Sequence, residues 1–295
     1  MGKMRESNAK ASFIASLQRY NKLDFSDLDR AFDDLLNGEK PTDLLSDLST
    51  PVLTLGSCFA VRLADRLGKY GYSPLNLTIS ELINTPLFNL ALIEAAVKSP
   101  EHSRYRHLLT DQAGEIPVQV DPKTVETLRE FLFKATTIVF TVGVGLLWRE
   151  RISRAIVLSP AKRRLEEYES FFPSPGEQAK MLEEIVGTIR QVNRHATLWI
   201  TLSPVPVETS FNYASAVVSD CVSKSTLRVA IHQLMSGIPE KVRYFPSFEF
   251  VRWVSGHFPA PAFGADGVVR HVNEALVDVI VRKFIALNGG RVAAA

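Results

Sequence analysis

Two residues with nucleophilic side chains, Ser57 and Cys58, follow a short apolar run and a glycine. The run is Val52–Leu55, and Gly56 permits the sharp turn needed before the helical pattern that begins near Phe59. Backbone N–H groups at the start of a helix stabilise both a thiolate and a developing oxyanion. The pattern suits nucleophilic attack on an acyl carbon. A Ser57 that only caps the helix, beside a Cys58 that is a small buried hydrophobe, would also explain it.

A candidate base lies near the other end of the chain, in the loop before the last helical pattern. His271 stands directly before that pattern, and Asp266 lies five positions earlier in the same loop. A carboxylate that orients an imidazole allows a histidine to accept a proton from a nucleophile. We expect one ring nitrogen of His271 within about 3–4 Å of Cys58 Sγ or Ser57 Oγ, and the other facing Asp266. His257 is the reserve base, and an Asp-Gly turn without any catalytic role is the simpler interpretation.

The candidate residues lie in a chain of apolar runs that alternate with amphipathic helical patterns. Nearly all-apolar strands between helices are typical of a buried parallel sheet with helices on both faces. The sequence therefore predicts a three-layer α/β fold. We expect four runs to lie side by side as parallel strands: Val52–Leu55, Ile138–Val142, Leu198–Leu202 and Val242–Phe245.

Helix start and stop signals separate the apolar runs. Gly71 is a predicted left-handed cap after the first helix, and Asp121-Pro122 opens the second. The sequence Ser174–Glu177 reads as a capping box with proline at the first helical position. A further helix ends at Gly237, and the last runs from about residue 273 to 287. These signals predict where each helix leaves the sheet.

The chain divides into an extension and one domain. Residues 1–50 are polar with a helical stripe around Phe32, and we interpret them as an N-terminal helical extension. Residues 51–290 form one α/β domain in this interpretation, because no repeat or low-complexity linker divides them. Within the domain, Asp111–Gly114 predicts a turn between two short strands.

Ligands of open parallel sheets bind beyond the carboxyl ends of the strands, so the residues after each apolar run are candidates for a binding site. After the second run these are Gly143 and Gly145, and after the third it is Ser203. After the fourth they are Ser247 and Glu249. The alternative is that the serines only serve turns and that Glu249 pairs with an arginine.

Composition excludes several classes of protein. Hydrophobic residues make up 46% and charged residues 22%, the profile of a globular chain. Lys plus Arg is 34 and Asp plus Glu is 32, so the net charge is +2. A charge balance this even gives no reason to expect the clustered basic surface that binds nucleic acid. Cys58 and Cys221 can form neither a disulfide framework nor a zinc site. Without a signal-peptide pattern or a run of about 18 apolar residues, we expect a cytoplasmic protein with no membrane partner. The oligomeric state stays open.

Several motifs in one order resemble those of the GSCFA family, a branch of the SGNH (GDSL-like) hydrolase superfamily. The first is the pentapeptide Gly-Ser-Cys-Phe-Ala itself, and the resemblance covers roughly residues 50–287. The motifs are Gly56–Ala60, Asn84–Pro86, Gly143 with Trp148, Thr201–Pro206, Ser223-Lys224 with Leu227-Arg228, and Tyr244–Glu249.

The resemblance implies a flavodoxin-like α/β/α domain with a nucleophile after the first strand and an Asp/His pair before the last helix. Aligning the glycines places Cys58 at the position of the superfamily's serine nucleophile, with Ser57 as its neighbour or an oxyanion donor. The superfamily's polar oxyanion-hole residue falls on the stretch from Gly143 to Leu146, where no side chain donates a hydrogen bond. Backbone N–H groups of Gly143 or Gly145, or the side chain of Asn84, would have to replace it.

Two functions follow from these observations. The first is an acyl-transfer enzyme, an esterase, deacylase or O-/N-acyltransferase, with a small-molecule or glycan acyl substrate. In such an enzyme, the side chain of Cys58 or Ser57 attacks the acyl carbon. His271 accepts the proton as the base, and Asp266 orients the imidazole of His271. No cofactor is required, although a thiol nucleophile would suit an acyl-CoA or acyl-carrier donor as co-substrate. The second is a weak or inactive binding module for a glycan or protein partner, favoured by the missing polar side chain near Gly143 and by an Asp–His spacing longer than the superfamily's usual three.

Overall fold

The computed structural model describes residues 20, 23–80, 83–110, 120–158, 160, 162–237 and 241–292. The turn predicted at Asp111–Gly114 lies outside the described residues.

The main sheet has five parallel strands in the order β2-β1-β3-β7-β8. Counted along the chain as five strands, this is the flavodoxin-like order 2-1-3-4-5. The four predicted strands are confirmed, and the edge strand β2, which the sequence did not predict, is short and half polar. The strands are β1 (Val52–Gly56), β2 (Leu75–Thr78), β3 (Thr137–Val142), β7 (Thr197–Leu202) and β8 (Val242–Tyr244).

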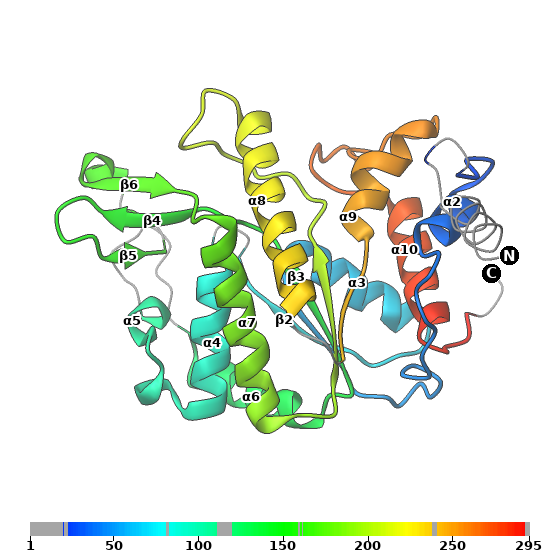
Figure 1. Ribbon diagram of the computed structural model, residues 1–295, viewed down its shortest axis with the longest axis horizontal. Helices are drawn as coiled ribbons and strands as arrows, with labels where there is room; N and C mark the ends of the chain where they lie inside the picture. Colours follow the sequence, from blue (N-terminus) through cyan, green and yellow to red (C-terminus); the bar gives the residue numbers. More distant parts are fainter. Residues whose placement is uncertain are drawn as a thin grey trace, which may run out of the picture.

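Helices cover both faces of this sheet, which confirms the three-layer fold (Figure 1). Alternate residues of each strand enter different cores: Ile138 and Ile200 pack on one face, and Val139 and Trp199 on the other. The first face, here the α4–α8 face, is covered by α4 (Pro86–Lys98), α6 (Pro122–Lys134), α7 (Pro175–Val192) and α8 (Ala216–Gly237). The second, the α3/α10 face, is covered by α3 (Cys58–Lys69), α10 (Glu274–Leu287) and α2 (Leu28–Leu35).

The predicted helix ends are present. Asp121 caps α6, and Ser174 forms the predicted capping box with Glu177 at the start of α7. Gly71 follows α3 with a φ of 89°, the left-handed conformation that glycine adopts without strain. The sequence pattern does not predict α4. Eleven of its thirteen residues are buried, so the helix has no polar face that would produce a helical period of polar and apolar residues.

A small antiparallel sheet projects from the body of the molecule in the order β5-β4-β6 (Figure 1). Its strands are β4 (Leu147–Glu150), β5 (Ile156–Val157) and β6 (Tyr168–Phe171). Because β4 begins directly after the segment that leaves β3, this sheet stands beside the carboxyl ends of the main strands. The remaining short helices are η2 (Pro100–His102), α5 (Arg106–Leu109), η3 (Lys162–Glu167), α9 (Ser247–Glu249), η4 (Phe250–Val254) and η5 (Ser255–His257).

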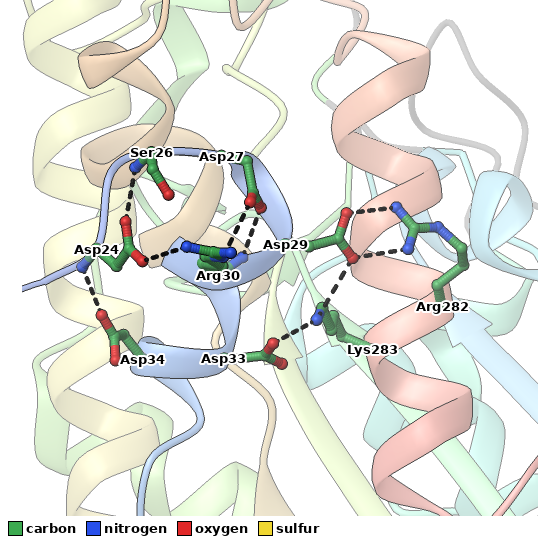
Figure 2. A network of polar contacts seen from close by, with 9 residues as sticks. All are labelled: Asp24, Ser26, Asp27, Asp29, Arg30, Asp33, Asp34, Arg282 and Lys283. Atoms are coloured by element: carbon green, nitrogen blue, oxygen red, sulfur yellow. Dashed lines mark hydrogen bonds and ion pairs between the residues drawn. The ribbon is translucent and has the colours of Figure 1, made fainter.

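Helix α2, predicted from the stripe around Phe32, packs on α10 with Phe32 fully buried. Ion pairs fasten the two helices at the surface (Figure 2). Arg282 donates to both carboxylate oxygens of Asp29, at 2.6 and 2.9 Å, and Lys283 donates to Asp33 at 2.7 Å. The α3/α10 face is therefore completed by a segment from the polar N-terminal stretch.

Candidate active site

Gly56, Ser57 and Cys58 lie at the carboxyl end of β1, between its neighbours β2 and β3. The chain passes from β1 to β2 on one side and reaches β3 on the other, which makes this the topological switch point where doubly wound sheets bind ligands. Gly56 has a φ of 115°, and a Cβ on it would lie 2.1 Å from the carbonyl oxygen of Thr141. Only glycine fits at this turn, as the sequence predicted.

Ser57 and Cys58 have different surroundings. Ser57 is buried and caps α3, where its Oγ accepts a hydrogen bond from the Phe59 N–H at 3.2 Å. Cys58 is the first residue of α3 and is half-buried. Both line the same cavity. The capping role expected as the alternative for Ser57 is present, and Cys58 is the more accessible of the two nucleophilic side chains.

Asn84 supplies a buried donor beside these residues. Its side chain is fully buried, and its Oδ1 accepts a hydrogen bond from Asn89 Nδ2 at 2.7 Å. This contact fixes the amide so that Asn84 Nδ2 points elsewhere, and Nδ2 has no hydrogen-bond partner. A Cβ placed on Gly143 would lie 3.1 Å from Asn84 Nδ2 and 3.5 Å from Ser57 Cβ. An unsatisfied buried donor is costly, and this one faces the space between Gly143 and Ser57.

The segment after β3 is held rigidly by α8. Lys224 Nζ donates to the Gly143 carbonyl at 2.8 Å, and the Gly145 N–H donates to Ser223 Oγ at 3.0 Å. The Val144 N–H donates to the carbonyl of Asn84 at 3.3 Å. The suggestion that Gly145 offers a backbone donor to an oxyanion was therefore wrong, because that N–H is already bonded within the protein.

A cavity of about 490 Å³ opens at this end of the sheet; we call it the main cavity. Its volume lies in the usual range for small-molecule sites. It extends from the ends of β1, β3 and β7 to the small sheet and the first half of α8. Polar lining residues are Ser57, Cys58, Asn84, Ser203, Glu208, Thr209, Ser219, Ser223 and Lys224, and the others are apolar or glycine. Of the buried side-chain atoms without a partner in the described part of the chain, Asn84 Nδ2 alone belongs to a lining residue.

Asp266 and His271 form a pair on the other side of the nucleophile residues, toward α10. His271 Nδ1 lies 2.7 Å from Asp266 Oδ2, so the expected contact is present despite the five-residue spacing. Gly264 and Gly267 both have positive φ and bend the loop back on itself. The hydrogen bond with His271, followed by that from the Val268 N–H, lowers the pKa of Asp266 below its usual value. Both side chains of the pair are about two-fifths exposed, and neither Asp266 nor His271 lines the main cavity.

Arg62 connects this pair to the helix that carries Cys58. It lies one turn beyond Cys58 on α3, and residues four apart share a helix face. Its guanidinium lies 3.7 Å from Asp266 and also pairs with Glu274 at the start of α10. The Asp266–His271 loop therefore contacts α3 through Arg62. The expected approach of His271 to Cys58 or Ser57 stays a prediction.

Arg270 ties the same loop to the rim of the main cavity. It donates to the Pro206 carbonyl at 3.1 Å and to the Glu208 carboxylate at 3.2 Å. Pro206 and Glu208 both line the cavity, and Arg270 directly precedes His271. The residue next to His271 is therefore bonded to two residues of the cavity lining.

Three other candidates have structural contacts. Ser203 lines the cavity, and its Oγ accepts from the Val205 N–H at 3.4 Å. Ser247 is fully buried, bonds Thr201 and lies outside the cavity lining. Glu249 binds Arg228 at 2.6 Å and the Tyr244 hydroxyl at 2.7 Å, at the β8 edge of the sheet. Placing Ser247 and Glu249 in the site was wrong, because their polar groups hold the turn after β8 and the edge of α8.

The reserve base, His257, lies with the N-terminal segment. Its Nε2 is 2.7 Å from the Tyr20 hydroxyl, and its ring stacks on Phe25 with centroids 4.1 Å apart. These contacts give it a packing role, which leaves His271 as the candidate base.

The sequence did not predict the apolar wall of the cavity or the two arginines, Arg62 and Arg270, whose contacts hold the Asp266–His271 loop. Arg62 could have been found as the residue one turn after Cys58, and Arg270 as the neighbour of His271. No local signal marks Leu158, Phe172 or Phe211 as lining residues, because each comes from a separate loop.

Among the residues that the structure describes, no group of three or more His, Cys, Asp or Glu side chains could hold a metal ion. Over the same residues, none of the helices has the length and apolar character needed to cross a membrane.

Comparison with known proteins confirms the resemblance drawn from the motifs. The model of the GSCFA family matches residues 51–284. No curated protein sequence matches the chain.

Solved structures that are similar to the chain include the following two. One is a carbohydrate esterase family 2 enzyme with a carbohydrate-binding domain from Corynascus thermopiles (Myceliophthora fergusii), at 14% identity and a TM-score of 0.38. That match covers 84% of this chain and 69% of the esterase chain. The other is the salicylyl-acyltransferase SsfX3 from a tetracycline biosynthetic pathway, at 12% identity and a TM-score of 0.34. It covers 81% of this chain, which spans about half (53%) of the acyltransferase.

Proposed function

The chain belongs to the GSCFA family, and we propose that it is an acyl-transfer enzyme that forms a covalent acyl intermediate on Cys58. The observation that carries the proposal is Asn84 Nδ2, a buried donor without a partner beside the nucleophile residues at the floor of the main cavity. A fixed donor aimed where negative charge develops is the usual device for stabilising a tetrahedral oxyanion.

In the proposed first half-reaction, Cys58 Sγ attacks the acyl carbonyl carbon while its proton passes to His271 Nε2. Nε2 is the ring nitrogen available for this transfer because Nδ1 contacts Asp266. The carbonyl oxygen becomes an oxyanion that accepts a hydrogen bond from Asn84 Nδ2. The tetrahedral intermediate collapses, the bond to the leaving group breaks, and His271 returns the proton to that group.

In the second half-reaction, an acceptor hydroxyl, amine or water attacks the thioester carbon. His271 accepts the proton of the acceptor and returns it to Cys58 Sγ as the carbon–sulfur bond breaks. The half-exposed Asp266–His271 pair provides a solvent-facing approach for the acceptor. Ser57 is the alternative nucleophile, but its role as the helix cap and its burial favour Cys58.

The binding-module alternative had two supports, the lack of a polar side chain between Gly143 and Leu146 and the five-residue spacing of Asp266 and His271, which form a hydrogen bond all the same. Asn84 places a side-chain donor next to Gly143 from another part of the sequence, which weakens that alternative. The choice between the two functions then depends on whether an acyl group is transferred to the protein.

The test is to trap the acyl-enzyme. Purified protein is mixed with a chromogenic acyl ester or an acyl thioester, quenched, and analysed by intact mass and peptide mapping. We expect one acyl group on the peptide that contains Cys58, and neutral hydroxylamine should remove it as it removes thioesters. The adduct should disappear in Cys58→Ala and persist in Ser57→Ala.

His271→Ala should form no adduct, whereas the matched control His232→Ala, an exposed histidine of α8, should acylate like the wild type. An adduct on Ser57 would transfer the nucleophile role to that residue. A protein that binds acyl compounds but is never acylated would contradict the proposal and favour the binding module.

A further inference from the structure

We propose that the main cavity is an acyl pocket for hydrophobic acyl groups longer than acetyl, and that Leu146, Trp148 and Phe211 set the accepted length. The inference rests on the proposed function, because it assigns the cavity to the acyl side of the acyl-enzyme. It adds the substrate class, which neither the family nor the nucleophile specifies.

The wall of the cavity is apolar beyond its polar floor. Its hydrophobic side chains include Val144, Leu146, Trp148, Leu158, Phe172 and Phe211, which come from four segments of the chain. A surface of this kind gains free energy by excluding water from a hydrocarbon chain, and its aliphatic side chains offer no hydrogen bond to the hydroxyls of a sugar ring or to a charged group. The wall therefore favours an aliphatic or aromatic acyl group over a polar one.

Polar lining groups around the nucleophile already have hydrogen bonds within the protein. Ser223 accepts from Gly145, and the Ser203 hydroxyl accepts from Val205. At the rim, Glu208 pairs with Arg270. Of the buried side-chain atoms of lining residues in the described part of the chain, Asn84 Nδ2 is the one without a partner, and it is placed to contact the single carbonyl of an acyl group.

The size of the cavity distinguishes acyl groups. At about 490 Å³ it lies in the range of sites that enclose whole drug-sized ligands, so an acetyl group would leave most of it empty. Each methylene that moves from water into such a wall strengthens binding by about fourfold. Affinity should rise with chain length until the cavity is full.

Two aromatic rings form a boundary of the main cavity that substitutions can change. Trp148 on β4 and Phe211 in the loop between β7 and α8 meet in a T-shaped contact with ring centroids 4.8 Å apart. Trp148 is 8% exposed and Phe211 is 48% exposed, so Phe211 lies between the cavity and solvent. Leu146, on the segment that leads into β4, narrows the same cavity.

The experiment measures binding apart from catalysis. Straight-chain carboxylates from acetate to dodecanoate are titrated into the wild-type protein by calorimetry. We expect the dissociation constant to fall about fourfold per methylene over the first several carbons and then to level off. Equal affinity across the series would overturn the proposal.

Variants then test the boundary residues. Leu146→Trp should weaken the longest chain that the wild type binds by at least about tenfold while leaving acetate unchanged, because it fills the cavity. Phe211→Ala should weaken the same chain by removing wall contacts, and its half-exposed position makes it the safer variant for folding. Val217→Trp, on an exposed position of α8 outside the cavity, is the matched control and should behave as the wild type. A Val217→Trp effect as large as that of Leu146→Trp would contradict the assignment.

The outcomes separate this inference from the proposed function. Chain-length-dependent binding without any acyl-enzyme would refute the enzyme and leave the pocket. An acyl-enzyme that forms with acetyl donors, alongside binding that ignores chain length, would refute the pocket and leave the enzyme.

Discussion

The two faces of the main sheet bring different polar chemistry to the same edge. On the α4–α8 face, Asn84, Ser223 and Lys224 are buried and hydrogen-bonded to backbone or to another amide. On the α3/α10 face, Arg62 and Asp266 belong to ion pairs with partly or largely exposed partners. Cys58 lies where these two regions meet.

This contrast indicates which half of the site has fixed side chains. Buried polar groups with single partners cannot move without losing a hydrogen bond that water does not replace. Exposed ion pairs are weak, and solvent can replace either partner. We therefore expect substitutions on the α4–α8 side to lower kcat strongly and substitutions on the α3/α10 side to lower it weakly.

The largest expected effect is that of Asn84→Ala. Removing a single oxyanion donor lowers turnover on the order of 10²- to 10³-fold in hydrolases where it has been measured, and we expect a loss of that size in kcat with little change in KM. Asn89 Nδ2 keeps its bond to the Thr85 carbonyl at 2.9 Å, so stability should fall by only about 1 kcal/mol. Steady-state kinetics on the preferred acyl ester, with a urea melt, measures both.

Ser203→Ala is the control for this variant because it lines the same floor but accepts from its own loop. We expect less than about a threefold change in its kcat. Equal losses in the two variants would mean that polarity of the floor, and not the Asn84 donor, supports turnover.

Gly143→Ala should have the next largest effect. Its added Cβ would lie 3.1 Å from Asn84 Nδ2 and occupy the space in front of that donor. Misplacement of a catalytic donor by a fraction of an ångström should lower kcat by about ten- to hundredfold. The matched control Gly187→Ala, with nothing within 4 Å of its added Cβ, should leave kcat unchanged. An unimpaired Gly143→Ala would place the oxyanion elsewhere.

On the exposed side, Asp266→Asn should lower kcat by only about tenfold. In serine proteases the loss is about 10⁴-fold for a buried carboxylate, but Asp266 is two-fifths exposed and water can take over part of its role. Because its pKa is lowered by His271, Asp266 stays charged in the wild type to below the usual pH for an aspartate. The pH profile should therefore show no loss from Asp266 above about pH 4.

The control is Glu274→Gln, which loses another partner of Arg62 and does not contact His271. Its kcat should stay within about twofold of the wild type. A 10⁴-fold loss in Asp266→Asn would show that the exposed side is as rigid as the buried one, and the contrast between the faces would not hold.

Local signals explain how much of the fold the sequence predicts. Apolar runs identify the four strands, and the caps Ser57, Asp121 and Ser174 mark helix starts because each satisfies free N–H groups nearby in the chain. Helix α4 is buried on all sides, so it lacks the period on which prediction depends. The strands of the small sheet are short and pair only with one another, which leaves no distinct pattern.

Part of the site was predictable from the rule that ligands of parallel sheets bind beyond the carboxyl ends of the strands. Ser57, Cys58, Gly143 and Ser203 meet because the carboxyl ends of β1, β3 and β7 lie side by side. The same rule failed for Glu249, because its carboxylate is bound by Arg228 and Tyr244, a contact that no local spacing reveals. The wall of the cavity was not predictable, since distant loops form it only in the folded state.

The smallest expected effect concerns the contact between α2 and α10 (Figure 2). The hydrogen bonds from Arg282 lower the pKa of Asp29, so Asp29 favours folding at pH values above the usual aspartate pKa of 3.8. That contribution disappears as the pH falls through the lowered value. Since the Asp29 side chain is 40% exposed, Asp29→Asn should cost only about 0.5–1 kcal/mol at pH 7 and lower Tm by about 1–3 °C.

In acid, the Tm values of Asp29→Asn and the wild type should converge once the wild-type carboxyl is protonated, because the two side chains are then both neutral. Asp33→Asn, which loses one contact with Lys283 from a more exposed position, is the matched control and should change Tm less. Both variants should retain wild-type kcat/KM, because α2 lies outside the cavity lining. A marked loss of activity in Asp29→Asn without a loss of stability would connect the α3/α10 face to catalysis more tightly than its exposed ion pairs allow.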